Sequence, residues 1–226
     1  MRIDVTFGQT DMEIRPTFDK IVRVGDGSVV YVSDAPALAQ GTIAGEFVSD
    51  EITSLRYSAF YGCKNLTKVS LPNCRTLAGD YTFANCNNLL EIDLPNLETA
   101  SAMARVFFGL KKVKEISLPE LTTAPNMEVT FSNCSLVRKI SMPKLETTSF
   151  QRYAFEDCWY LHTLILGGTT VHALGNTNAF KGVAYYAERP FYIYVPDELV
   201  DSYKTATNWS NFADKIKGIS EKEADR

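Results

Sequence analysis

Hydrophobic residues recur at a fixed spacing along most of this 226-residue chain. Short stretches alternate apolar and polar positions, and each stretch ends in a Leu-Pro or Met-Pro pair. These pairs stand at nearly equal intervals, at Leu71-Pro72, Leu94-Pro95, Leu118-Pro119 and Met142-Pro143. A period of about 23 to 25 residues is typical of repeat proteins, in which stacked units bury apolar faces that one unit alone cannot bury.

A second marker runs in phase with the first. Phenylalanines recur with the same period at Phe60, Phe83, Phe107, Phe131, Phe155 and Phe180. Three residues after each comes a small or aliphatic residue, in turn Cys63, Cys86, Leu110, Cys134, Cys158 and Val183. The unit reads F-x-x-C-x-x-L-x-x-I-x-L-P-x-L, and its phased apolar positions are the predicted core.

The alternating part of each unit predicts a strand, since side chains along a strand point in turn to opposite faces. The expected strands are Lys68 to Leu71, Glu91 to Leu94, Glu115 to Leu118, Lys139 to Met142 and Thr163 to Leu166. We therefore expect an α/β repeat solenoid with a curved parallel sheet. Its predicted parts are a β-rich N-terminal segment over 1–49, the repeats over 50–190, and a C-terminal strand and helical cap over 191–226.

The two ends of the chain depart from the repeat. Alternation at Ile3, Val5 and Phe7 predicts one strand, and residues 21–24 and 29–32 flank a Gly-Asp-Gly turn as a hairpin. This segment is either a cap over the first coil or an attachment module. At the other end, residues 191–195 predict a last strand, and a helical pattern follows that forms a cap or a docking helix pair. Residues 221–226 are expected to be a frayed, charged tail.

The unit resembles the BspA-like leucine-rich repeat. The stretches Ala59-Phe60-Tyr61-Gly62-Cys63-Lys64-Asn65-Leu66 and Ala154-Phe155-Glu156-Asp157-Cys158-Trp159-Tyr160-Leu161 carry the likeness, which covers about residues 50 to 183. It implies a right-handed coil in a bacterial or bacteriophage protein that binds proteins or surface glycans, often as an adhesin. Family motifs here are structural, so the resemblance assigns no ligand residues. The resemblance also implies an extracellular or virion-associated location. The chain begins without a recognisable signal peptide, and without the resemblance a cytoplasmic location would be expected.

Composition narrows the choice of partner. The formal net charge of −4 argues against nucleic acid, which is bound by clustered Lys and Arg. No stretch reaches the roughly 18 apolar residues that a membrane span needs, so membrane insertion is not expected. The sequence does not indicate an oligomeric state.

Residues that could carry chemistry are explained by the repeat. Four of the five cysteines stand three residues after a phenylalanine of the repeat, and Cys74 takes a position held by Leu in later units. We expect free, buried thiols, although stacked Cys63 and Cys86, or Cys134 and Cys158, would be near enough to bridge. His162 and His172 have neither metal-ligand nor catalytic spacing, and His162 is expected on the strand surface. We predict no enzyme activity, no metal and no cofactor.

The outward strand positions are the candidate ligand surface. They form two columns, and the predicted binding residues are Lys68, Ser70, Glu91, Asp93, Glu115, Ser117, Lys139 and Ser141. Their charges and hydroxyls could contact a polar protein surface or a glycan. The alternative, equally favoured by the sequence, is that these side chains contact only solvent. The columns contain no aromatic residue, which makes a tight sugar site less expected. The predicted function is a recognition module, and the alternative is a structural or decorating component of a phage particle or extracellular assembly.

Overall fold

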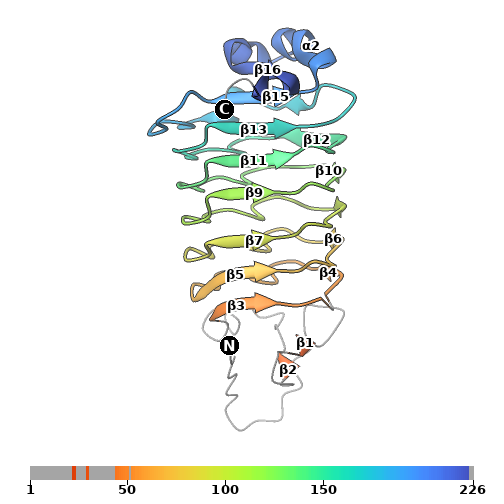
Figure 1. The fold of residues 1–226 in the computed structure, drawn as a ribbon, viewed down its shortest axis with the longest axis vertical. Coiled ribbons are helices and arrows are strands. Elements are labelled where there is room, and N and C mark those ends of the chain that lie inside the picture. The colour runs from red at the N-terminus through yellow and green to blue at the C-terminus, as the bar shows by residue number, and fades with distance from the viewer. Residues whose placement is uncertain (1–21, 24–28, 31–43, 51, 224–226) are drawn as a thin grey trace.

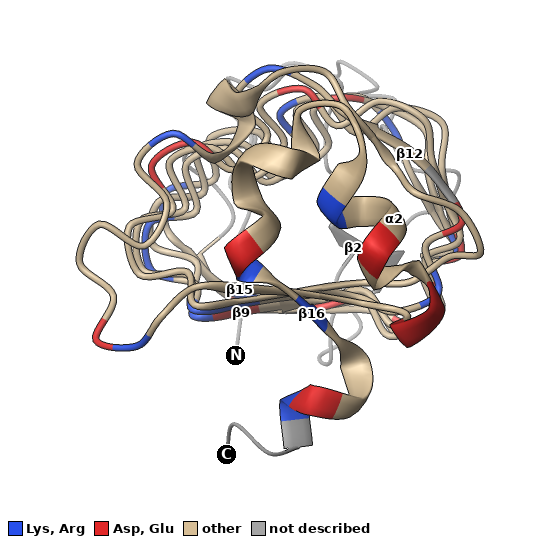
Figure 2. Ribbon diagram, turned by 90° about the horizontal axis from the view of Figure 1, so that it is seen from above, with Lys and Arg blue, Asp and Glu red and all other residues tan. Residues whose placement is uncertain are grey.

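The structure is a computed structural model that describes residues 22–23, 29–30, 44–50 and 52–223. The repeats form a solenoid, in which each coil lies directly on the preceding one (Figure 1). The coils nearly overlie one another in the view along the stack, so the solenoid curves only slightly (Figure 2). Core side chains from successive coils therefore form continuous columns inside it.

Parallel strands on one side of the solenoid form its main ladder. They are β3 (Gly45–Val48), β5 (Leu66–Ser70), β7 (Glu91–Asp93), β9 (Glu115–Ser117), β11 (Lys139–Met142), β13 (Thr163–Leu166), β15 (Tyr192–Val195) and β16 (Ile216–Gly218). The five predicted strands are confirmed. The ladder also extends beyond them. Strand β3 lies before residue 50, where the repeats were predicted to begin, and it pairs with β5. We call the outward surface of these strands the strand face.

The main ladder is interrupted between β7 and β9. Strands β3, β5 and β7 form one sheet and β9 to β16 another, and β7 does not pair with β9. The interruption falls where Glu91 and Glu115 follow each other on the strand face. In the aligned positions Glu46, Lys68, Glu91, Glu115 and Lys139, this is the only step between like charges. Like charges directly opposite each other disfavour pairing, which gives the interruption a physical basis.

A second ladder of mostly two-residue strands runs along another side of the coil (Figure 2). It consists of β4 (Ser54–Leu55), β6 (Thr76–Leu77), β8 (Thr99–Ala100), β10 (Thr123–Ala124), β12 (Thr147–Phe150) and β14 (Ala173–Leu174). It is unbroken across the coils where the main ladder is interrupted, because β6 pairs with β8 and β8 with β10. This second ladder was not predicted.

The phased phenylalanines stack in a single column through the core. Neighbouring rings from Phe60 to Phe180 are within 9° of parallel, and their centroids are 5.0 to 5.9 Å apart. The widest step, 5.9 Å between Phe83 and Phe107, coincides with the interruption between β7 and β9. These rings are buried, as the repeat pattern predicts.

One slot of the repeat is fixed by backbone conformation. The residue before each cysteine position has a positive φ, between 56° and 74°, and is Gly, Asn or Asp in every coil: Gly62, Asn85, Gly109, Asn133, Asp157 and Gly182. These residue types tolerate the left-handed region best. The sequence therefore contains a turn signal that the F-x-x-C reading missed.

The cysteines are buried and unpaired, as predicted. Three of them also donate hydrogen bonds between coils. The thiol of Cys86 donates to the Phe60 carbonyl at 3.0 Å, and Cys134 and Cys158 reach the carbonyls of Phe107 and Phe131 in the same way. Burial raises the pKa of Cys134 to about 12, so its thiol stays protonated and remains a donor. In these three coils the slot holds a small side chain that is also a weak donor, whereas Leu110 and Val183 fill the same slot without a hydrogen bond from the side chain.

At the N-terminal end, β1 (Val22–Arg23) and β2 (Val29–Val30) pair antiparallel, which confirms the predicted hairpin. The strand predicted around Ile3 to Phe7 lies outside the described residues.

None of the described helices is long and apolar enough to cross a membrane.

The C-terminal segment covers the last coil with short helices. They are η2 (Asp197–Leu199), α2 (Val200–Thr205) and η3 (Trp209–Lys215). Helix η1 (Thr177–Phe180) lies within the last coil itself, and η4 (Ile219–Glu223) follows β16. The Trp209 Nε1–H donates to the His172 carbonyl at 2.7 Å, and the backbone N–H of His172 donates to the Tyr203 hydroxyl at 3.1 Å. These buried bonds fix the helices on the end of the core.

The expectation of a frayed tail from residue 221 is wrong for its first part. Residues 221–223 belong to η4, and the Glu221 carboxylate accepts a hydrogen bond from the Gly218 N–H at 2.9 Å. The Ser220 N–H donates to Asp197 Oδ1 at 3.1 Å. These bonds turn the chain outward, so that η4 lies outside the main ladder, on its strand face (Figure 2).

Candidate functional site

The strand face holds the eight predicted residues in two columns. The parallel register aligns Lys68 with Glu91, and Glu115 with Lys139. Lys68 Nζ lies 2.7 Å from Glu91 Oε1, and hydrogen bonding to Glu91 raises the pKa of Lys68. Lys139 pairs with Glu115 in the same way. Ion pairs between adjacent coils thus order the column on each side of the interruption.

The second column is less exposed than predicted. The Ser70 hydroxyl donates to Asp93 Oδ2 at 2.7 Å, and Ser117 is exposed. Ser141, however, is only 8% exposed, and the next residue in its column, Ile165, is 5% exposed. The placement of Ser141 on an open ligand surface is therefore wrong. The open part of this column ends at Ser117.

Aromatic residues extend both columns beyond the predicted strands. Tyr192 of β15 aligns with Thr163, and Tyr194 aligns with Ile165. The expectation that the columns lack an aromatic residue is therefore wrong. It failed because the stretch of chain from Thr163 to Tyr192 is longer than the stretch between aligned positions in earlier coils, such as Lys139 and Thr163.

A longer turn before β15 accounts for the irregular step. The Tyr186 N–H donates to the Trp159 carbonyl at 2.9 Å, and the Tyr192 N–H donates to the His162 carbonyl at 3.0 Å. Between these two bonds the earlier coil runs three residues, from Trp159 to His162, and the later coil runs six, from Tyr186 to Tyr192. The extra residues protrude from the edge of the solenoid in Figures 1 and 2. We call residues 184–190 the insertion loop.

Exposed aromatic rings gather at the insertion loop. Tyr185 is 74% exposed, Tyr186 is 54% exposed and Trp159 is 36% exposed. The Tyr186 ring lies 4.7 Å from that of Tyr185, 5.8 Å from that of Trp159 and 6.1 Å from that of Tyr160. Clustered exposed aromatic side chains are uncommon on a protein surface and are typical of binding sites. We call these four residues the aromatic cluster.

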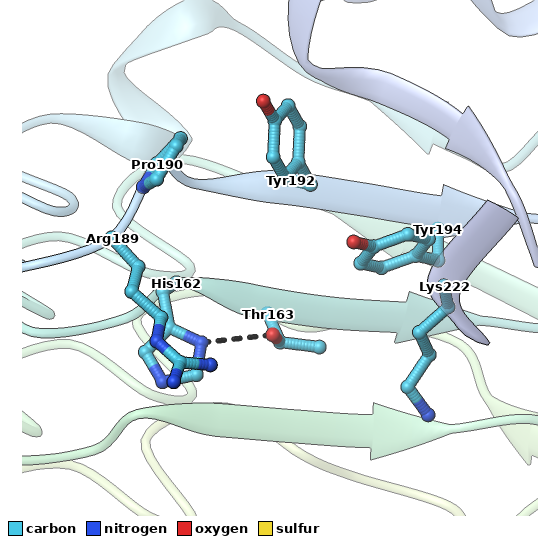
Figure 3. Close-up of a pocket in the computed structure, with 7 residues that line it drawn as sticks. All are labelled: His162, Thr163, Arg189, Pro190, Tyr192, Tyr194 and Lys222. Carbon is cyan, nitrogen blue, oxygen red and sulfur yellow. Dashed lines mark hydrogen bonds between the residues drawn. The ribbon is translucent and has the colours of Figure 1, made fainter. Parts of the chain in front are cut away.

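A hollow of about 320 Å3 lies between the insertion loop and the strand face. In Figure 3, Arg189 and Pro190 enter from the loop, Thr163 lies in the middle, and Lys222 of η4 lies on the opposite side. Tyr192 and Tyr194 form one wall, with ring centroids 6.3 Å apart. We call this cavity the Arg189 hollow.

His162 also lines the Arg189 hollow. Its Nδ1 is 2.9 Å from the Thr163 hydroxyl (Figure 3). Partial burial lowers the pKa of His162, and the positive charges of Arg189 and Arg138 lower it further. The imidazole is therefore neutral near pH 7. His162 was predicted to lie on the strand surface, but nothing in the sequence indicated that it lines a cavity. The cavity exists because the last coil is longer than the others.

The described residues show no arrangement for catalysis by a metal. No group of three or more His, Cys, Asp or Glu among them could hold a metal ion. The second histidine, His172, is only 3% exposed, and its Nε2 lies 3.1 Å from the Gly167 carbonyl oxygen. It serves the C-terminal cap.

Comparison with known proteins gives the family. The BspA type leucine rich repeat region matches residues 46–162 in six copies. No curated protein matches the chain. The crystal structure of the pneumococcal vaccine antigen PcpA is similar over 88% of this chain, at 16% identity and a TM-score of 0.52, and the chain covers 46% of that protein. This likeness shows the shared fold.

A second similar structure is the leucine-rich-repeat protein of T. pallidum. It is 19% identical, with a TM-score of 0.45, and the match covers 89% of this chain and 95% of that one. The six matched repeats span just over half of the sequence, and their strands and phenylalanines form the stacked coils described above. The chain belongs to the BspA-type leucine-rich-repeat family.

Proposed function

We propose that this protein is a non-catalytic recognition module that binds a protein or a surface glycan. The contact surface is the strand face together with the aromatic cluster at its end. Repeats of this type generally mediate protein binding or adhesion. The same proposal places the protein outside the cell or on a virion, where such ligands are met.

The aromatic cluster is the observation that carries this proposal. Two of its rings, Tyr185 and Tyr186, lie on the coil that is longer than the repeat, and the other two, Trp159 and Tyr160, lie beside them on the preceding coil. Insertions in repeat proteins commonly lie on the binding face. The core does not need these side chains, because the phenylalanine column continues through Phe180 without them. Tyr, Trp and Arg are also the residue types that contribute most to binding energy at interfaces.

The strand face supplies a rigid polar surface beside the cluster. Its side chains can change without disturbing the fold, because the apolar positions between them face the core. Glu91 and Glu115 have side chains that are 56% and 50% exposed. Exposed charges of this kind contribute little to stability, yet they affect the choice of partner through electrostatic complementarity.

The test is a screen of the purified protein against an array of defined glycans and an array of purified extracellular proteins. Ligands found there are then measured with two double variants. Glu91→Lys with Glu115→Lys alters the strand face. Glu128→Lys with Glu156→Lys is the matched control, because it makes the same charge change and also removes two ion pairs between coils, Arg152–Glu128 and Lys181–Glu156.

We expect the strand-face pair to weaken or retarget binding while the free energy of unfolding falls by at most about 2 kcal/mol, since each exposed ion pair contributes about 0 to 1 kcal/mol. The control pair should bind normally. A third variant, Tyr185→Ala with Tyr186→Ala, should also weaken binding. If the control pair abolishes binding while both test variants bind like the parent, the ligand surface lies elsewhere and the proposal is wrong.

A further inference from the structure

The Arg189 hollow has features that specify a narrower class of ligand than the strand face does. It is produced by the insertion loop, since Arg189 and Pro190 reach it only because the chain leaves the coil between Tyr186 and Tyr192. A cavity of about 320 Å3 lies within the usual size range of small-molecule sites. An adjoining hollow shares His162 and Arg189 and adds Arg138, Tyr160 and Glu188.

Positive charge predominates around the hollow. Arg189, Arg138 and Lys222 line the two adjoining cavities, and among the described residues Glu188 is the only carboxylate that lines them. Within the described residues, Arg138 and Arg189 form no ion pair, whereas Arg75, Arg152 and five lysines each pair with a carboxylate. Two arginines near one imidazole form a site for an anion, because a guanidinium fits a carboxylate or sulfate with two parallel hydrogen bonds.

The wall of the hollow is aromatic and its floor is hydroxylated. Tyr192 presents its ring and phenol group, whereas Tyr194 is only 3% exposed and adds little open surface to the wall. Thr163 adds a hydroxyl in the middle of the floor (Figure 3). Lys217 Nζ lies 3.8 Å from the centroid of the Tyr192 ring, which fixes that ring. Rings beside hydroxyl groups suit a ligand with one apolar face and several hydroxyls.

We propose that the Arg189 hollow and the adjoining hollow together bind an anionic saccharide residue. Its ring lies against Tyr192 in the Arg189 hollow, and its carboxylate or sulfate lies on Arg189, which lines both hollows, and on Arg138 of the adjoining hollow. This rests on the proposed recognition function and names the ligand class for one end of the surface. The site is too short for a nucleic-acid backbone, which needs a row of cations along a strand. A saccharide presents the three required features, anion, hydroxyls and apolar ring face, within one small unit.

The experiment measures binding of defined saccharides to the whole chain by isothermal titration calorimetry and by saturation-transfer NMR. The probes are 3′-sialyllactose, a hyaluronan tetrasaccharide and a heparin tetrasaccharide, and lactose is the neutral control. These probes separate sialic acid, uronic acid and sulfate as sources of the anion. The variants are Arg189→Gln and Arg138→Gln, with Arg75→Gln as a matched control because Arg75 is exposed and pairs with Glu98 outside the hollow.

We expect at least one anionic probe to bind and lactose to give no signal. Each hollow variant should weaken that binding by about tenfold or more, because a charge-assisted hydrogen bond is lost. Arg75→Gln should bind like the parent, and all three variants should show parental thermal unfolding.

Three outcomes would overturn the inference. They are no signal from any anionic probe, equal binding of lactose and 3′-sialyllactose, or equal weakening by Arg75→Gln and Arg189→Gln, which would indicate unspecific charge attraction. If the arrays instead yield a protein ligand whose binding survives Arg189→Gln and fails with the Glu91 and Glu115 pair, the recognition function stands and the saccharide assignment fails.

Discussion

Phe131 tests how strongly the aromatic column holds the coils together. Its ring is fully buried and stacks on Phe107 at 5.5 Å and on Phe155 at 5.4 Å, each within 9° of parallel. Phe131→Ala removes both ring contacts and leaves a cavity. Emptying a buried aromatic position costs about 3 to 5 kcal/mol, and each lost aromatic pair accounts for about 0.5 to 1.5 kcal/mol beyond area burial.

The upper part of that range is expected, because the neighbouring backbone cannot move to fill the cavity. The Phe131 N–H donates to the Ala154 carbonyl at 2.8 Å, and the Phe107 N–H donates to the Thr130 carbonyl at 3.0 Å. These bonds hold adjacent coils at a fixed spacing. We therefore expect Phe131→Ala to lower the free energy of unfolding by about 4 to 5 kcal/mol.

Urea denaturation followed by circular dichroism measures this loss. The matched control is Phe108→Ala, which removes an equal ring from a half-buried position in the corresponding turn of the preceding coil and should cost less than about 2 kcal/mol. Amide hydrogen exchange should quicken in the coils next to Phe131, since stability passes between adjacent repeats. A loss in Phe131→Ala no greater than that in Phe108→Ala would refute the column as the main support of the core.

Two further predictions concern the cap and the hollow. Trp209→Phe removes the hydrogen bond to the buried His172 carbonyl and should lower the free energy of unfolding by about 1 to 3 kcal/mol in the same urea assay; an unchanged midpoint would contradict it. In the Arg189 hollow a bound anion should raise the lowered pKa of His162, so that affinity for the anionic saccharide that binds there rises as pH falls from about 7 to about 5. Calorimetry at both pH values checks this, and a His162→Gln variant with the same pH dependence would show that another group is responsible.

The main ladder could be predicted from the sequence because its signal is repeated. Lys139–Met142 and Thr163–Leu166 are strands over the predicted residues, since apolar and polar positions alternate there in phase with the phenylalanines. The second ladder could not be predicted, because strands such as Thr99–Ala100 have only two residues. Two residues cannot display an alternation, and their pairing is imposed by the stacking of the coils.

The candidate site shows the same limit. Its ordered columns followed from the repeat, but the Arg189 hollow arises where the period lengthens between Thr163 and Tyr192. Pairing of β15 with β13 places Tyr192 beside Thr163 in space, although no phase in the sequence aligns them. The burial of Ser141 was missed as well, because alternation tells which way a side chain points and gives no information on what covers it.

The interruption between β7 and β9 also affects the mechanics of the solenoid. The second ladder and the phenylalanine column cross this position, so the two blocks of coils are joined along those sides and unjoined on the strand face. We therefore expect bending stiffness to be lowest there, because flexing about the second ladder would change the separation of Glu91 and Glu115 without breaking a backbone hydrogen bond between those strands. If the strand face is the contact surface proposed above, we expect this flexing to let its spacing fit ligands of different width while every coil remains folded.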